Sequence, residues 1–263
     1  CIKIFVFLPR KISKSMQESH FASKSCWKER TELLLGQNGV ARLDAARVCV
    51  AGAGGVGAAA AEMLVRAGTG HIIIIDSDRF SESNINRQLP ALHSTVGCKK
   101  VDVLRERLTD INPDLDIVTI DEYLNEESIP SVFSFLSEKP LDFVVDAIDT
   151  LSPKIALIQF CLNNGIKLVS SMGSGAKTDA TAVRIADISK TYQCPLAHML
   201  RKRLHKLGIK DGFLAVFSAE MPERAAVVLE ESANKKSQVG TISYLPTVFG
   251  CVCAQAVIKE IIK

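Results

Sequence analysis

The segment RVCVAGAGGVG, residues 47–57, decides the fold. Its first part, Arg47–Ala51, is short and rich in β-branched residues, which predicts a strand. The small residues of Ala58–Ala67 predict a helix directly after it. Between them stands the pattern G-x-G-x-x-G, with glycines at Gly52, Gly54, Gly55 and Gly57. Glycines allow a tight turn and a close approach of backbone to phosphate, and the helix N-terminus offers free N–H groups. The segment therefore predicts a phosphate-binding turn.

Strand and helix signals continue to alternate beyond this turn. The run His71–Asp76 is almost wholly apolar, which is typical of a strand buried on both faces of a parallel sheet. We expect further strands at Asp116–Ile120, Leu141–Ala147 and Lys167–Ser171, and helices at Cys98–Thr109 and Pro153–Asn164. This order predicts an α/β fold with a doubly wound, mostly parallel, Rossmann-like sheet.

The pattern becomes less regular after Ser171. We expect a basic helix at Pro195–Leu207, a buried apolar helix at Pro246–Ile262, and strands at Ala182–Asp187, Phe213–Ala219, Ala225–Leu229 and Thr241–Tyr244. Neither an internal repeat nor a low-complexity linker is visible. The sequence thus favours one domain over residues 30–263, with an elaborated C-terminal half that contains antiparallel strands.

Composition sets broader limits. The chain has 263 residues, a formal net charge of +3 and a pI near 8.4, which suits a nucleic-acid partner without requiring one. Its eight cysteines include no C-x-x-C pair, so a zinc site and a disulfide framework are not expected. Residues 1–29 form a basic leader that we expect to be flexible. A cytoplasmic location is expected, with a mitochondrial one as the alternative. We expect no membrane span.

The residues after the glycine turn narrow the choice of nucleotide. Asp76 follows the turn by about 20 residues, where an acidic group can hold a ribose, and this much leaves NAD, FAD and ATP open. Arg87 and Lys100 add positive charge that suits a polyphosphate. Asp146 and Asp149 follow a strand at the edge where open α/β sheets bind ligands, and a carboxylate there suits Mg²⁺. Hydride transfer does not need a cluster of cations and carboxylates around the phosphates, so ATP is favoured over NAD.

These residues also carry a family resemblance. The motifs that match are Gly52–Gly57, Asp76-x-Asp78, Asn84-x-Asn86-Arg87-Gln88, Lys100 and Asp146-x-x-Asp149. Together they resemble the ubiquitin-activating-enzyme superfamily, which includes the molybdopterin-synthase and thiamine-pathway adenylyltransferases. Within it, the chain is most similar to the tRNA threonylcarbamoyladenosine dehydratases. That closer match rests on residues 30–36, 146–154, 170–175, 187–191 and 216–220.

The resemblance implies which residues bind ATP. Asp76 would hold the ribose, while Asn84 and Arg87 would contact the phosphates. The full expected set is Gly52, Gly54, Gly55, Gly57, Asp76, Asp78, Asn84, Arg87, Lys100 and Asp146. It also implies catalytic roles for Arg87, Lys100 and Asp149, with Lys100 beside the α-phosphate and Asp149 as the Mg²⁺ ligand.

The family reaction joins a carboxylate to the α-phosphate of ATP and releases pyrophosphate. In the dehydratase branch, the carboxylate is the threonyl group of a modified adenosine beside the tRNA anticodon. The resulting acyl-adenylate is attacked from within the same side chain, so a cyclic product forms and AMP leaves. The resemblance thus implies tRNA as the partner substrate, and a homodimer as the assembly.

Three alternatives stay open at this stage. The first is adenylation of the C-terminus of a ubiquitin-like or sulfur-carrier protein, with Cys194 forming a thioester. The others are an NAD-dependent oxidoreductase and a non-catalytic scaffold. Two departures from the family pattern keep the scaffold in view. Trp27 stands where relatives often have an arginine, which leaves Arg30 as the candidate to reach a partner subunit, and Cys194 replaces a usual aspartate.

Overall fold

The computed structural model describes residues 4–5, 26–135, 139–229 and 237–263. Its strands are β1 (Ile4–Phe5), β2 (Arg47–Ala51), β3 (His71–Ile75), β4 (Asp116–Ile120), β5 (Phe143–Asp146), β6 (Leu168–Ser171), β7 (Val183–Asp187), β8 (Leu214–Ser218), β9 (Val227–Leu229) and β10 (Ser237–Val239). Its α-helices are α1 (Glu29–Ala45), α2 (Gly55–Ala67), α3 (Lys100–Ile111), α4 (Ser128–Phe135), α5 (Leu151–Asn163), α6 (Pro195–Lys206) and α7 (Tyr244–Ile261).

An eight-stranded sheet forms the centre of the molecule. Its strand order is β1-β4-β3-β2-β5-β6-β8-β7. The six inner strands, which are β4, β3, β2, β5, β6 and β8, pair in parallel. The edge strands β1 and β7 run antiparallel to their neighbours. The predicted doubly wound α/β fold with antiparallel strands in its C-terminal half is confirmed. Most of the leader expected at residues 1–29 lies outside the described residues, so its flexibility stays a prediction.

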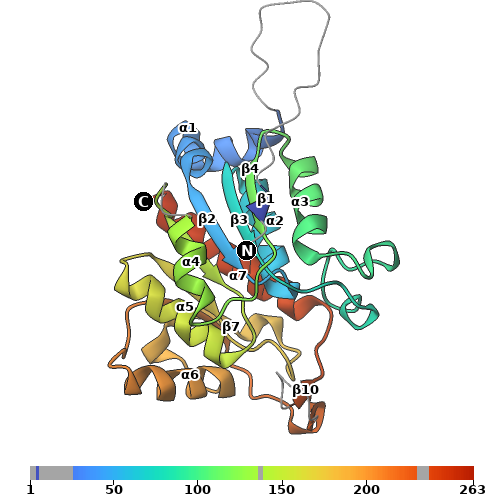
Figure 1. Ribbon diagram of the computed structural model, residues 1–263, viewed down its shortest axis with the longest axis vertical. Helices are drawn as coiled ribbons and strands as arrows, with labels where there is room; N and C mark the ends of the chain where they lie inside the picture. Colours follow the sequence, from blue (N-terminus) through green and yellow to red (C-terminus); the bar gives the residue numbers. More distant parts are fainter. Residues whose placement is uncertain (1–3, 6–25, 136–138, 230–236) are drawn as a thin grey trace, which may run out of the picture.

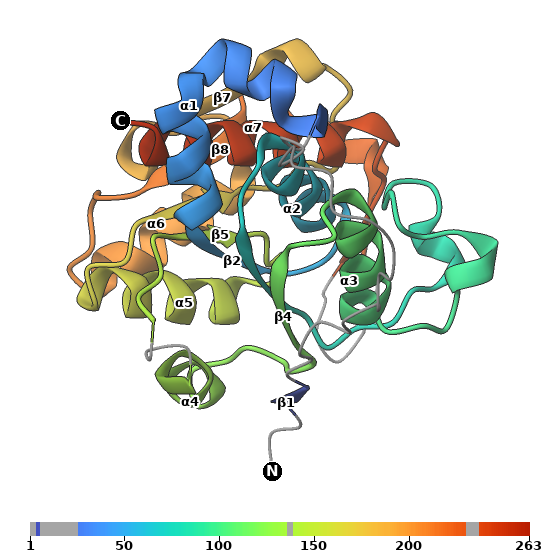
Figure 2. The same cartoon turned by 90° about the horizontal axis from the view of Figure 1, so that it is seen from above.

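Helices cover both faces of the sheet, as Figures 1 and 2 show. Successive residues of a strand point to opposite faces, and the central strand β2 shows this clearly. Val48 and Val50 join the apolar core beneath α2, α3 and α7. Cys49 and Ala51 join the second core, beneath α4, α5 and α6. Both faces are thus sealed, and only the edges and ends of the sheet are available for chemistry.

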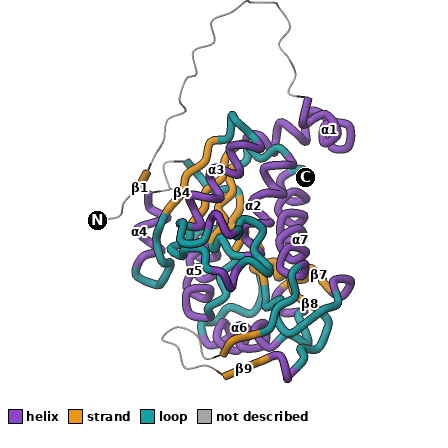
Figure 3. Tube along the Cα trace, turned by 90° about the vertical axis from the view of Figure 1, so that its right-hand side faces the viewer, coloured by secondary structure: helices purple, strands orange, loops and turns teal. Residues whose placement is uncertain are grey.

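The apolar C-terminal helix α7 packs closely on α2, and the two helices lie side by side in Figures 1 and 3. A Cβ atom at Gly250 of α7 would lie 2.6 Å from the Cβ atom of Ala59 in α2, so the contact depends on small residues. Among the described residues, α7 alone is long and apolar enough for a membrane span, and 44% of it is buried within the protein. Its apolar side chains Leu245, Phe249 and Val257 belong to the core, as its all-round apolar pattern predicts.

One predicted strand is wrong. Thr241–Tyr244 forms no strand, because α7 already begins at Tyr244 and the pairing segment is β10. Pro246 suits the first turn of a helix, and the backbone oxygen of Thr241 accepts a hydrogen bond from the Asn86 amide (3.0 Å) instead of a ladder bond.

Glu62 links α2 to α3 and allows a stability prediction. Its carboxylate is 5% exposed and accepts hydrogen bonds from Arg107 (2.6 Å) and Arg66 (2.9 Å). Burial acts to raise the pKa of Glu62, but the two guanidinium groups outweigh it and hold the pKa below its usual value. We expect Glu62→Gln to lower the free energy of unfolding at pH 7 by about 1–3 kcal/mol.

The difference in unfolding free energy between wild type and Glu62→Gln should depend on pH in a known direction. A carboxylate with a lowered pKa stabilises the fold above its unfolded-state pKa, and this contribution is lost as the pH falls through the folded-state value. Urea unfolding should therefore separate wild type from Glu62→Gln at pH 7, and the separation should shrink below the usual pKa of 4.5. Glu106→Gln, on the exposed side of α3, is the matched control. A separation that stays constant with pH would contradict the ionic role of Glu62.

Candidate active site

The ends of three neighbouring strands bring the predicted residues together. β2 pairs in parallel with β3 on one side and with β5 on the other, so Ala51 lies level with both Ile75 and Asp146. The chain leaves β2 toward β3 and later returns to β5 on the opposite side. Open α/β sheets bind ligands at such a reversal of strand order. The glycine turn, Asp76 and the 146–149 segment therefore share one edge.

The glycine turn needs its glycines for two different reasons. A Cβ atom at Gly57 would lie 1.7 Å from the Gly52 carbonyl oxygen, and one at Gly52 would lie 2.8 Å from the Ala147 oxygen. A side chain at Gly52 or Gly57 would therefore clash with backbone atoms of the protein itself. A Cβ atom at Gly54, in contrast, would meet only the Gln88 amide nitrogen, at 3.8 Å. The space above Gly54, at the N-terminus of α2, is open and is suited to a phosphate group.

Asp76 ties this turn to β3. One carboxylate oxygen accepts a hydrogen bond from the Ala53 N–H (2.6 Å), and the other accepts one from the Asp78 N–H (2.7 Å). Lys100, which begins α3 and is 5% exposed, donates to the Asp78 carboxylate at 2.8 Å. The fold therefore places a nearly buried cation beside Asp78, whose N–H is bonded to Asp76, the residue expected to hold the ribose.

The loop before α3 supplies the arginine. Arg87 is half-buried, and its guanidinium donates to the Ser83 carbonyl oxygen (2.7 Å) and to the Asn86 side-chain oxygen (2.8 Å). The side-chain oxygen of Asn84 accepts a bond from the Ser81 N–H at 3.2 Å, so Asn84 holds the start of this loop. The loop passes over the glycine turn, since a Cβ atom at Gly55 would lie 2.8 Å from the Arg87 carbonyl oxygen.

Gln88 is a site residue to which the sequence assigned no role. It is 7% exposed, and its side-chain oxygen is buried without a hydrogen-bond partner among the described residues. A buried amide oxygen without a partner costs about 1–3 kcal/mol. Because the other end of this amide faces Gly54, a ligand at the turn would contact Gln88 as well. Its place directly after Arg87 is the signal that would have found it.

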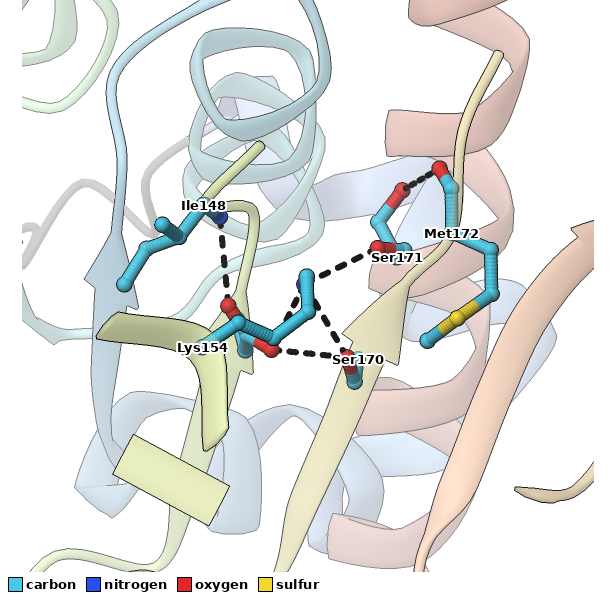
Figure 4. Close-up of polar contacts among 6 residues, drawn as sticks. Ile148, Lys154, Ser170, Ser171 and Met172 are labelled. Carbon is cyan, nitrogen blue, oxygen red and sulfur yellow. Dashed lines mark hydrogen bonds and ion pairs between the residues drawn. The ribbon is translucent and has the colours of Figure 1, made fainter. Parts of the chain in front are cut away.

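Asp146 supports the site from beneath. It has no exposed surface and forms an ion pair with Lys154 of α5 at 2.7 Å. Figure 4 shows Lys154 also donating to the Ser170 hydroxyl (3.1 Å) and the Ser171 carbonyl oxygen (3.0 Å). The second Asp146 oxygen accepts a bond from the Ile148 N–H at 3.1 Å, which fixes the segment that leads to Asp149. The predicted contact between Asp146 and nucleotide stays a prediction.

Asp149 is exposed at the end of this segment. No group of three His, Cys, Asp or Glu side chains that could hold a metal ion occurs within the part of the chain that the structure describes. A single carboxylate is nevertheless a fitting ligand set for Mg²⁺, which is usually held by one or two carboxylates together with substrate phosphates and water.

A second polar cluster follows β6. Lys177 is 4% exposed, and its amine donates to the Gly173 carbonyl oxygen at 3.1 Å. Burial lowers the pKa of Lys177, although nearby Cys194 and Glu220 oppose this effect. The Glu220 carboxylate accepts bonds from the Thr178 and Asp179 N–H groups at 3.0 and 2.8 Å. Lys177 is thus a desolvated cation close to the same edge of the sheet.

The sequence matches a known protein family and several curated proteins. A family model described as "ThiF family" matches residues 29–263. The chain belongs to the ThiF family. Among curated ThiF relatives, the tRNA threonylcarbamoyladenosine dehydratase of Bacillus subtilis (strain 168) is 40% identical, over 89% of this chain and 94% of that protein. The enzyme of the same name from Escherichia coli (strain K12) is 34% identical, with the same coverage.

Solved structures agree with these relatives. The ThiF-family chain is similar to the crystal structure of E. coli tRNA N6-threonylcarbamoyladenosine dehydratase, TcdA, in complex with ATP. The TM-score is 0.81 at 33% identity, over 92% of this chain and 97% of that one. The TcdA complex with AMP matches with a TM-score of 0.80. E. coli MccB, at 19% identity, shares the fold.

Proposed function

We propose that this ThiF-family protein uses ATP to adenylate the threonyl carboxylate of threonylcarbamoyladenosine in tRNA, and then drives its cyclising dehydration. The observation that carries the proposal is the open space above Gly54 at the N-terminus of α2, which the Gln88 amide faces and beside which the Arg87 backbone passes. Two curated relatives, at 40% and 34% identity, bear the name of this activity, and solved structures of the E. coli enzyme contain ATP or AMP.

Each residue of the site has a place in this reaction. The turn and the N-terminus of α2 hold the phosphates, and Asp76 holds the ribose at its free lone pairs. Lys100 and Arg87 stabilise the negative charge that develops when the carboxylate attacks the α-phosphate. Asp149 would hold Mg²⁺, which supplies further positive charge on the phosphates.

Adenylation turns a poor leaving group into a good one, because AMP departs far more easily than hydroxide. The second step is intramolecular, so the reacting atoms meet at a high effective concentration. The enzyme therefore needs no nucleophile of its own. This fits the position of Cys194, which is 3% exposed at the start of α6.

A homodimer is part of the proposal. Leu33 and Leu34 of α1 are each 82% exposed, next to a break in the helix at Gly36. Adjacent large apolar side chains with this exposure are suited to a protein interface. Arg30 on the same helix then becomes the candidate to reach the nucleotide of the partner subunit.

Pyrophosphate release tests the first step directly. The protein with ATP should release pyrophosphate when tRNA carrying threonylcarbamoyladenosine is added, and should not do so with the same tRNA lacking the modification. Equal release with both tRNAs would contradict the proposed substrate.

Gly54→Ala is expected to weaken ATP binding without weakening the fold. Gly54 has φ −77°, which alanine readily adopts, and its added methyl group would enter only the open space above the turn. We expect an ATP dissociation constant at least about tenfold higher, measured by calorimetry, because the methyl group takes the place of a phosphate oxygen. Urea unfolding without nucleotide should match wild type. Unchanged ATP affinity would place the phosphates elsewhere.

A further inference from the structure

A pocket of about 600 Å³ lies beside α6, outside the nucleotide site. Its size is within the range of small-molecule sites. It is lined by Gln193, Cys194, Pro195, His198, Arg201, Met221, Pro222, Glu223 and Arg224. Two prolines and a methionine give the pocket apolar walls, and of its charged or titratable lining side chains three are basic and one, Glu223, is acidic.

The loop after β6 contacts the start of α6, where the pocket lies. A Cβ atom at Gly173, just after β6, would lie 3.8 Å from the Cβ atom of Leu196 in α6. β6 in turn pairs with β5, where Ser170 lies level with Asp146. The loop after β6 therefore begins beside the strand end that carries Asp146 and then contacts the start of α6.

One face of α6 extends the basic character of the pocket along the molecular surface. At about 100° per residue, His198, Lys202 and His205 fall on the same face of the helix. The residues of this face outside the pocket, namely Lys202, His205 and Lys206, are all exposed. The opposite face carries Ala197, Leu200 and Leu204, which are buried in the core. We call the exposed side the basic face of α6; it leads directly into the pocket.

Lys177 is a buried positive charge in the segment that follows β6, close to the pocket. It lies near Cys194, a pocket residue, and near the Glu220 carboxylate. Its amine donates to the neutral Gly173 carbonyl oxygen at 3.1 Å and forms no ion pair among the described residues, although the Glu220 carboxylate is close enough to raise its pKa. A buried cation is stabilised by an anion. A substrate carboxylate close to the Cys194 side of the pocket would be attracted to this amine.

We propose that the pocket beside α6 binds the modified adenosine after it leaves the base stack of the tRNA, while the basic face of α6 binds the flanking phosphates. The inference rests on the proposed function and adds to it the place where the acceptor substrate binds. Proteins that recognise RNA loops hold unstacked bases in this way, and enzymes that act on a base take it out of the stack. The apolar walls suit a purine ring, and the basic groups suit its carboxylate and the RNA backbone.

Three variants test this assignment by steady-state dehydration of modified tRNA. Met221→Glu places a carboxylate in the pocket at a residue that is 63% exposed, so the fold should tolerate it. Lys202→Glu reverses one charge on the basic face. Arg203→Glu makes the same reversal about 140° around the helix from His198, and is the matched control.

We expect KM for tRNA to rise at least about tenfold in Met221→Glu and in Lys202→Glu, with little change in Arg203→Glu. The dissociation constant for ATP should stay at the wild-type value in all three variants, which also reports an intact fold. Lys202→Glu should in addition reduce the slope of log KM against log salt by about one.

A KM for tRNA within about twofold of wild type in Met221→Glu and Lys202→Glu would overturn the assignment, and so would an equal rise in Arg203→Glu. These outcomes differ from a failure of the proposed function, in which the wild-type protein itself would leave the modified tRNA unchanged.

Discussion

Lys154→Met is expected to lower the free energy of unfolding by about 3–5 kcal/mol, because it leaves the Asp146 carboxylate buried without its cation. Neither side chain of this pair has exposed surface, and their charged atoms are 2.7 Å apart. Lys154 also binds Ser170 and Ser171, so its loss would leave three polar groups of β5 and β6 to rearrange. Chemical denaturation followed by circular dichroism measures the effect.

The double variant Asp146→Asn, Lys154→Met is the control for this prediction. It removes both charges together, so it should recover much of the stability lost in the single variant. If Lys154→Met alone unfolded at the wild-type midpoint, the buried pair would not hold the site together. If the double variant were no more stable than the single one, the loss would come from packing rather than from the unpaired carboxylate.

Arg87→Ala is expected to lower tRNA-dependent pyrophosphate release about 100- to 1000-fold, the usual effect of removing a donor that stabilises charge in a transition state. The hydrogen bonds from Arg87 to Ser83 and Asn86 hold the guanidinium on the loop that crosses the glycine turn. The measurement is a coupled assay of pyrophosphate with saturating ATP and modified tRNA.

Arg87→Lys separates charge from geometry in this experiment. Lysine keeps the positive charge but lacks the planar fork of donors, so an intermediate rate is expected. Denaturant unfolding of both variants should match wild type, since Arg87 is only half-buried in a loop. Pyrophosphate release at the wild-type rate in Arg87→Ala would remove Arg87 from the proposed mechanism.

The sequence predicted the parts of the site that depend on local pattern. The glycine turn follows from glycine spacing between a strand and a helix, and the structure needs Gly52 and Gly57 for steric reasons. Asp76 was found from its distance after the turn, and it does contact the turn through the Ala53 N–H. The short sequence separation between the glycine turn and Asp76 is enough to predict this contact, because consecutive βα units pack side by side.

Residues whose partners come from distant strands were harder to find. Lys154 reads as a single lysine in an apolar helix, and its importance appears only when α5, β5 and β6 pack together. Thr241 has the side chain of a strand residue, but its backbone oxygen bonds to Asn86, about 155 positions earlier in the chain. The pocket beside α6 joins residues 193–201 to residues 221–224, and no sequence spacing indicates that these two segments meet.

Mass spectrometry of tRNA nucleosides tests the central claim most directly. tRNA that carries threonylcarbamoyladenosine would be incubated with the protein, ATP and Mg²⁺, digested gently to nucleosides, and compared with a reaction without ATP. The account predicts that the modified nucleoside loses the mass of one water, about 18 Da, only when ATP is present, because adenylation must precede the cyclisation. An unchanged nucleoside mass, with the protein folded and ATP bound, would contradict it.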